Sequence, residues 1–292
     1  MLGIEIDKNY YSQSLGISCV EKSVLGFLEY IKYPYQILFI DSYINLESVF
    51  TDFLETNVPY MKFTGLKRLQ QVSEELGILK TEYMETNFDK MVQCSCIELT
   101  ERRPLLVRVK PNKLPNAKFM PWAEEHFILL YKIDNEFFLL NQYPLSEYVM
   151  TLDEIRDIYD GAILRIVPIF NVDLKQYKQM AQKTIEKIAK QKEYNFIYEI
   201  TDDNVEHLRN AVGVLKLSRL QIKEWLVWLK SNFDEINYHI EVIPYLEELV
   251  SIFNKLYLAI EYYRYRKNNL LYIKELINTV VRMENSLKNY FE

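Results

Sequence analysis

Residues 126–142 read HFILLYKIDNEFFLLNQ. Two runs of apolar and aromatic residues flank the dipeptide Asp134-Asn135, a pattern that is typical of two strands joined by a two-residue turn. We therefore expect an antiparallel β-hairpin in which residue 133 pairs with residue 136.

The expected register brings two polar side chains together. It places residue 126 opposite 143 and residue 128 opposite 141, so His126 and Asn141 become diagonal neighbours on one face, about 7–8 Å apart at the backbone. An asparagine side chain can bridge that gap and orient an imidazole ring. The hairpin therefore predicts a histidine that is held in place by an asparagine.

The rest of the first half mixes helical and extended patterns. Runs of helix followed by runs of strand predict an α+β domain. Helices are expected at 19–31, 45–54, 66–76 and 152–159, and further strands at 36–40, 104–109 and 161–167.

The second half is expected to be helical. After Pro168, only Pro244 and Gly213 remain of the chain's nine prolines and seven glycines, and apolar residues recur every three or four positions. Residues 218–221 look like a capping box at a helix start, and Pro244 suits the first turn of a helix. We expect four or five helices, and we divide the chain into a catalytic domain at 1–169 and an α-helical domain at 170–292.

Composition excludes several classes of function. A chain of 292 residues with only 7 glycines contains no dinucleotide-binding or phosphate-binding glycine loop. A net charge of −6 argues against nucleic acid as a partner. No stretch approaches the roughly 18 uninterrupted apolar residues that a membrane span needs, and the N-terminus lacks the pattern of a signal peptide. With three cysteines and no disulfide framework, we expect a cytoplasmic protein without a membrane partner.

Cys19 is the candidate nucleophile. A polar loop containing Gly16 leads into an apolar helix that is expected to begin at this cysteine. At a helix start, the macrodipole and the unpaired N–H groups are expected to lower the pKa of the thiol. Gln13 lies six residues upstream, where its side-chain amide can stabilise an oxyanion together with the Cys19 backbone N–H.

Cys19, His126 and Asn141 thus form a candidate nucleophile, base and orienting residue. The other two cysteines, Cys94 and Cys96, are expected on one face of a strand as core residues. No second cysteine or histidine pair accompanies them, so no metal site is expected.

The spacing of Gln13, Cys19, His126 and Asn141 resembles that of papain-like cysteine peptidases, and the expected fold is a papain-like domain followed by a helical bundle. More narrowly, residues 9–168 resemble the N-terminal domain of the butirosin biosynthesis protein H family and the related cysteine-protease-like amide synthetase of closthioamide assembly. The segment Pro104–Lys110, the strand at His126 and the helix after it contribute to this resemblance. Asn141 stands where peptidase relatives often have aspartate, and an asparagine can also orient an imidazole.

The resemblance implies an acyltransferase or amide synthetase of nonribosomal natural-product biosynthesis, including antibiotic biosynthesis. Such an enzyme takes an acyl or peptidyl group from the phosphopantetheine thioester of a carrier protein, holds it on the cysteine, and delivers it to a small amine, such as a diamine. No bound cofactor is expected, because the carrier protein brings the activated group. Two alternatives remain open: a cysteine hydrolase (a peptidase or thioesterase) with the same triad, and a catalytically silent interaction protein.

Overall fold

The computed structural model describes residues 2–7, 15–58, 63, 65–115, 117–119, 126–142, 145–233, 236 and 238–291. The chain forms two compact units. The first comprises Met1–Tyr35 and Leu69–Val172, and the second comprises Gln36–Arg68 and Asp173–Glu292. The second unit therefore includes residues 36–68, which the sequence analysis assigned to the catalytic domain.

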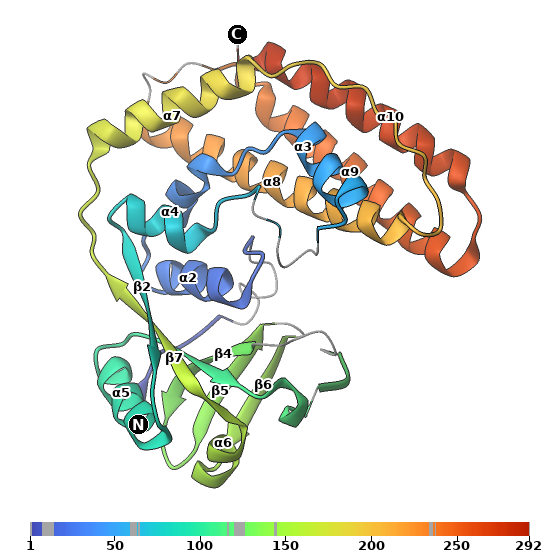
Figure 1. The fold of residues 1–292 in the computed structure, drawn as a ribbon. Helices are drawn as coiled ribbons and strands as arrows, with labels where there is room; N and C mark the ends of the chain where they lie inside the picture. Colours follow the sequence, from blue (N-terminus) through green and yellow to red (C-terminus); the bar gives the residue numbers. More distant parts are fainter. Residues whose placement is uncertain are drawn as a thin grey trace. The chain divides into compact units, whose positions relative to one another are not determined.

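An antiparallel sheet forms the centre of the first unit (Figure 1). In the described residues its order is β2-β7-β3-β4-β5-β6, with β1 paired to β4. The strands are β1 (Leu2–Gly3), β2 (Leu79–Glu85), β3 (Leu105–Val109), β4 (His126–Ile133), β5 (Phe137–Gln142), β6 (Leu145–Met150) and β7 (Tyr159–Pro168). The unit also contains the helices α2 (Cys19–Tyr30), α4 (Leu69–Glu75), α5 (Phe88–Thr100) and α6 (Leu152–Ile158) and the short 3₁₀ helices η4 (Pro111–Lys113) and η5 (Ala117–Phe119). The α+β class of the first half is confirmed.

The β4–β5 hairpin differs from the prediction near its turn. Ile133 pairs with Phe137 and not, as predicted, with Glu136, because the loop is one residue longer than expected. A β-bulge between Leu130 and Lys132 absorbs the extra residue, so that Leu130 pairs with Leu139. The predicted pairing at the turn is wrong, whereas the predicted register toward the other end of the hairpin is present.

Both faces of this hairpin are buried, which explains its continuous apolar sequence. Side chains of one face, including Ile128 and Leu139, form a core with Met91 and Leu99 of α5. Leu140 follows Leu139 in the strand, so its side chain points to the opposite face, and it is also fully buried. The helix α2 contacts β4 and β5. The sheet is therefore packed between helices.

Two predicted strands are helical. Cys94 and Cys96 lie within α5, so the expected strand face is wrong. Asn87 caps this helix by accepting a hydrogen bond from the Lys90 N–H at 2.9 Å, and the buried residues recur with helical spacing. Residues 36–40, also expected as a strand, belong to the 3₁₀ helix η1 (Tyr35–Asp41).

The second unit is helical, as predicted. Helix α9 (Val242–Arg266) packs against both α8 (Val205–Asn232) and α10 (Leu270–Leu287) (Figure 1). The unit also contains α7 (Leu174–Ala189), the short helix α3 (Leu46–Phe50) and a π-helical turn η2 (Thr51–Glu55). Pro244 lies in the first turn of α9, as expected. The predicted capping box at 218–221 is wrong, because these residues lie inside α8.

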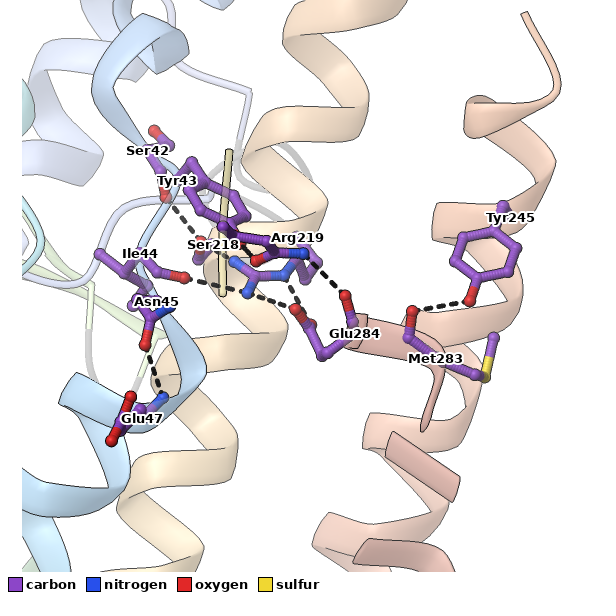
Figure 2. Close-up of polar contacts among 11 residues, drawn as sticks. Ser42, Tyr43, Ile44, Asn45, Glu47, Ser218, Arg219, Tyr245, Met283 and Glu284 are labelled. Carbon is purple, nitrogen blue, oxygen red and sulfur yellow. Dashed lines mark hydrogen bonds and ion pairs between the residues drawn. The ribbon is translucent and has the colours of Figure 1, made fainter. Parts of the chain in front are cut away.

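A buried ion pair explains why residues 36–68 belong to the helical unit (Figure 2). Arg219 of α8 and Glu284 of α10 are almost fully buried, and Nε and Nη2 of the guanidinium donate to the two carboxylate oxygens at 2.7 Å each. Nη2 also donates to the Ile44 carbonyl at 2.9 Å. The Ser218 hydroxyl donates to the Ser42 carbonyl at 2.6 Å. Two backbone carbonyls of this segment therefore find their partners on α8.

We expect the Arg219–Glu284 pair to behave as a buried ion pair. Arg219→Met should destabilise the helical unit by about 3–5 kcal/mol, because it leaves the Glu284 carboxylate buried without its partner. The double variant Arg219→Met/Glu284→Leu should recover much of that loss. Urea unfolding followed by tryptophan fluorescence measures the effect, since Trp225 and Trp228 lie on α8.

Lys190→Ala is the matched control. Lys190 forms an exposed pair with Glu186 at 3.5 Å in the same unit, so its loss should cost about 1 kcal/mol or less. Equal costs for Arg219→Met and Lys190→Ala would contradict this account of the buried pair.

Candidate active site

Cys19 is the first residue of α2, and a capping box fixes the start of this helix. The Ser18 hydroxyl accepts a hydrogen bond from the Glu21 N–H, and the Glu21 carboxylate accepts one from the Ser18 N–H, both at 3.2 Å. The sequence signal is the tetrapeptide Ser18-Cys-Val-Glu21, which matches the S-x-x-E pattern. The sequence analysis predicted the helix start but did not use this signal.

The turn before Cys19 is held from two sides. The buried Glu21 carboxylate also accepts hydrogen bonds from the N–H groups of Ile17 at 2.6 Å and Leu69 at 3.2 Å. Gly16 packs so tightly on the helix that a Cβ atom there would lie 2.7 Å from the backbone nitrogen of Lys22. Only glycine fits at that position, so the chain at Gly16 packs closely on the start of the helix.

Burial raises the pKa of the Cys19 thiol, which corrects the predicted direction. The backbone N–H groups of Phe127, Val20 and Cys19 itself donate toward the sulfur and lower its pKa, but they act less strongly than desolvation. The charge of Glu21 adds a small rise. Cys19 nevertheless remains partly exposed. The helix start offers N–H donors, as predicted, yet the surrounding protein favours the neutral thiol.

His126 and Asn141 make the predicted contact. Nε2 of the imidazole lies 2.8 Å from Oδ1 of the asparagine, and the two residues are 9% and 0% exposed. Because a carbonyl oxygen only accepts, Nε2 carries the proton in this arrangement and Nδ1 keeps its lone pair. Burial lowers the pKa of His126, and the hydrogen bond to Asn141 raises it by a smaller amount. The ring is therefore a neutral base at neutral pH.

Helix α2, which begins at Cys19, contacts β4, the strand that begins at His126. The backbone N–H of Phe127, the residue that directly follows His126, acts to lower the pKa of the Cys19 thiol. Cys19, His126 and Asn141 all belong to the first compact unit. The nucleophile, the base and the orienting residue therefore lie on a helix and a hairpin of the same compact unit.

One predicted site residue is not placed. Gln13, the expected side-chain donor of the oxyanion hole, lies outside the described residues. The backbone N–H of Cys19 stands at the helix start, as the prediction requires. Lys22 is an addition that the sequence analysis missed: its ammonium interacts with the charge of a Cys19 thiolate, and burial lowers its pKa.

Within the described ranges, no three histidine, cysteine, aspartate or glutamate side chains form a group that can hold a metal ion. Across the same residues, no helix has the length and apolar character that crossing a bilayer requires.

Comparison with known proteins adds no relative. No protein-family model matches the chain, and no curated protein matches it significantly. The resemblance to the butirosin biosynthesis protein H family therefore rests on the quoted residues alone.

Proposed function

We propose that the protein is a cysteine-dependent acyltransferase that acts as an amide synthetase. It takes an acyl or peptidyl group from the phosphopantetheine thioester of a carrier protein and transfers it to an amine. The observation that carries this proposal is the buried His126–Asn141 hydrogen bond, on strands that contact α2, the helix that begins at Cys19. The donor and the acceptor are proposed from the resemblance of residues 9–168.

The first half-reaction loads the cysteine. Nδ1 of His126 takes the thiol proton while the Cys19 sulfur attacks the thioester carbonyl carbon. The resulting oxyanion is stabilised by the Cys19 N–H and the Gln13 amide. The carbon–sulfur bond to pantetheine then breaks, and the leaving thiolate takes the proton back from the imidazolium. The product of this step is an acyl-S-Cys19 enzyme.

The second half-reaction releases the product. An amine attacks the acyl carbon, and His126 accepts the proton that the amine loses. The bond to Cys19 breaks, and its thiolate recovers that proton. The two half-reactions are balanced without an external energy source, because the thioester is already activated.

The electrostatics favour general-base catalysis over a preformed ion pair. Burial raises the pKa of Cys19 and lowers that of His126, so both groups are neutral in the resting enzyme. Charge then develops only as the sulfur attacks. Catalytic hydrogen bonds in free enzymes are often long and tighten when substrate binds.

The two alternatives make different use of the same residues. A hydrolase needs the same triad with water as the acceptor. A catalytically silent protein is favoured by one observation, the burial that raises the pKa of Cys19. The partial exposure of this residue and the oriented base beside it favour a reactive thiol.

Cys19 should be the single acylated residue. Incubation with an acyl-pantetheine thioester should add one acyl mass, which peptide sequencing by mass spectrometry then maps. Cys94→Ala/Cys96→Ala is the matched control and should load normally, because both residues lie on α5. A label that survives Cys19→Ala would exclude this nucleophile. A wild-type chain that takes up no label would favour the silent alternative.

His126 and Asn141 should have separable effects on turnover. His126→Ala should slow turnover by at least about 100-fold, because the base is lost. In the wild type, activity should fall as pH drops through the pKa of His126, which lies below the ordinary histidine value. Asn141→Ala removes the hydrogen bond that raises this pKa, so the acid limb should move to lower pH.

The measurement is the pH dependence of kcat/KM for each variant. An acid limb that stays in place in Asn141→Ala would show that the asparagine does not act on the base. Unchanged turnover in His126→Ala would remove the histidine from the mechanism.

A further inference from the structure

Gln142 at the end of β5 reaches the helix that carries the nucleophile. Its Nε2 donates to the Ser23 hydroxyl at 2.7 Å, and this hydroxyl donates to the Cys19 carbonyl oxygen at 2.9 Å. Gln142 is 2% exposed and Ser23 is 0% exposed. A continuous buried hydrogen-bond chain therefore runs from the strand to the residue that is proposed to be acylated.

The direction of this chain is unambiguous. The Cys19 carbonyl oxygen can only accept a hydrogen bond, so the Ser23 hydroxyl donates its single proton to it. The hydroxyl oxygen therefore accepts the hydrogen bond from the Gln142 amide. Bonds in such a chain polarise one another, and water does not compete at buried atoms. The chain therefore fixes the first turn of α2 against β5.

Stability alone is a poor explanation for this glutamine. In the described part of the chain, its Oε1 atom is buried without a hydrogen-bond partner. Burying an unpaired carbonyl is costly, and a methionine of similar length would fill the same space without that cost. What the amide adds is a bond in one specific direction, toward the helix of Cys19.

Asn141 and Gln142 are consecutive residues of one strand, so their side chains point to opposite faces. Asn141 holds the imidazole of His126, and Gln142 holds the turn that bears Cys19. We infer that Gln142 is a positioning residue that sets the nucleophile relative to the base. This inference rests on the proposed function. One dipeptide then aligns both partners of the proton transfer.

The effect should appear in kcat more than in KM. Misplacing a reacting group by about 1 Å can slow a reaction about 100-fold, without any change in substrate contacts. The Phe127 N–H lowers the pKa of the Cys19 thiol, and the size of this effect depends on the position of the start of α2. Loss of the Gln142–Ser23–Cys19 hydrogen-bond chain should therefore shift the pH profile of thiol alkylation toward higher pH.

The test compares Gln142→Met, Ser23→Ala and the double variant in the full-length protein. Each single variant should lower kcat by about tenfold or more, leave KM within about twofold, and move the pH profile of Cys19 alkylation by iodoacetamide to higher pH. The double variant should match the single variants, because all three break one chain. If Gln142→Met fails to fold, Ser23→Ala tests the same chain, because it deletes only one oxygen atom.

Ser95→Ala is the matched control. Ser95 is also fully buried, and its hydroxyl donates to the carbonyl four residues earlier, that of Met91, at 2.8 Å. Its loss should change thermal stability as much as Ser23→Ala does, while the kcat and the alkylation profile remain those of the wild type.

Two results would overturn the inference: a folded Gln142→Met or Ser23→Ala variant with wild-type kcat and alkylation profile, or additive losses in the double variant. Failure of the proposed function looks different. In that case the wild type itself is not acylated by the thioester, while the alkylation profiles still report whether Gln142 positions Cys19.

Discussion

The register of the β4–β5 hairpin is the constraint on which the site depends. Side chains alternate between faces, so a slip of one residue would turn Asn141 away from His126. The loop is one residue longer than a two-residue turn, and it would cause that slip if the strands were regular. The bulge between Leu130 and Lys132 restores the register before the strands reach the site. A local irregularity near the turn thus makes the contact at the other end possible.

The two units treat buried polar groups differently. Arg219 and Glu284 form a buried ion pair in the helical unit, and their mutual hydrogen bonds offset the cost of desolvation. For Cys19 and His126 the hydrogen-bonding contributions are smaller than the cost of desolvation, so burial shifts the pKa of each toward the neutral form. A neutral pair costs little in the resting protein and can still exchange a proton during attack. The ion pair organises structure, whereas the neutral pair is suited to chemistry.

Local patterns predicted the parts of the fold that depend on neighbours in the chain. Two apolar runs around a turn dipeptide were enough for the hairpin and for the His126–Asn141 contact, although the predicted pairing at the turn was wrong. A polar loop before an apolar run was enough for the helix at Cys19. The placement of residues 36–68 was not predictable in this way, because it depends on Arg219, far along the chain. The direction of the Cys19 pKa was missed for the same reason, since desolvation comes from the tertiary surroundings. The Gln142–Ser23 contact spans 119 positions and has no local signal.

The central claim is that His126 rests as a neutral base with its proton on Nε2, held by Asn141. Heteronuclear NMR of the ring nitrogens in a histidine-labelled sample tests it directly, with the His126 signal assigned by its loss in His126→Gln. The account predicts a neutral ring with the proton on Nε2 at neutral pH, and a mixture of tautomers in Asn141→Ala. An imidazolium, or a proton fixed on Nδ1, would contradict it.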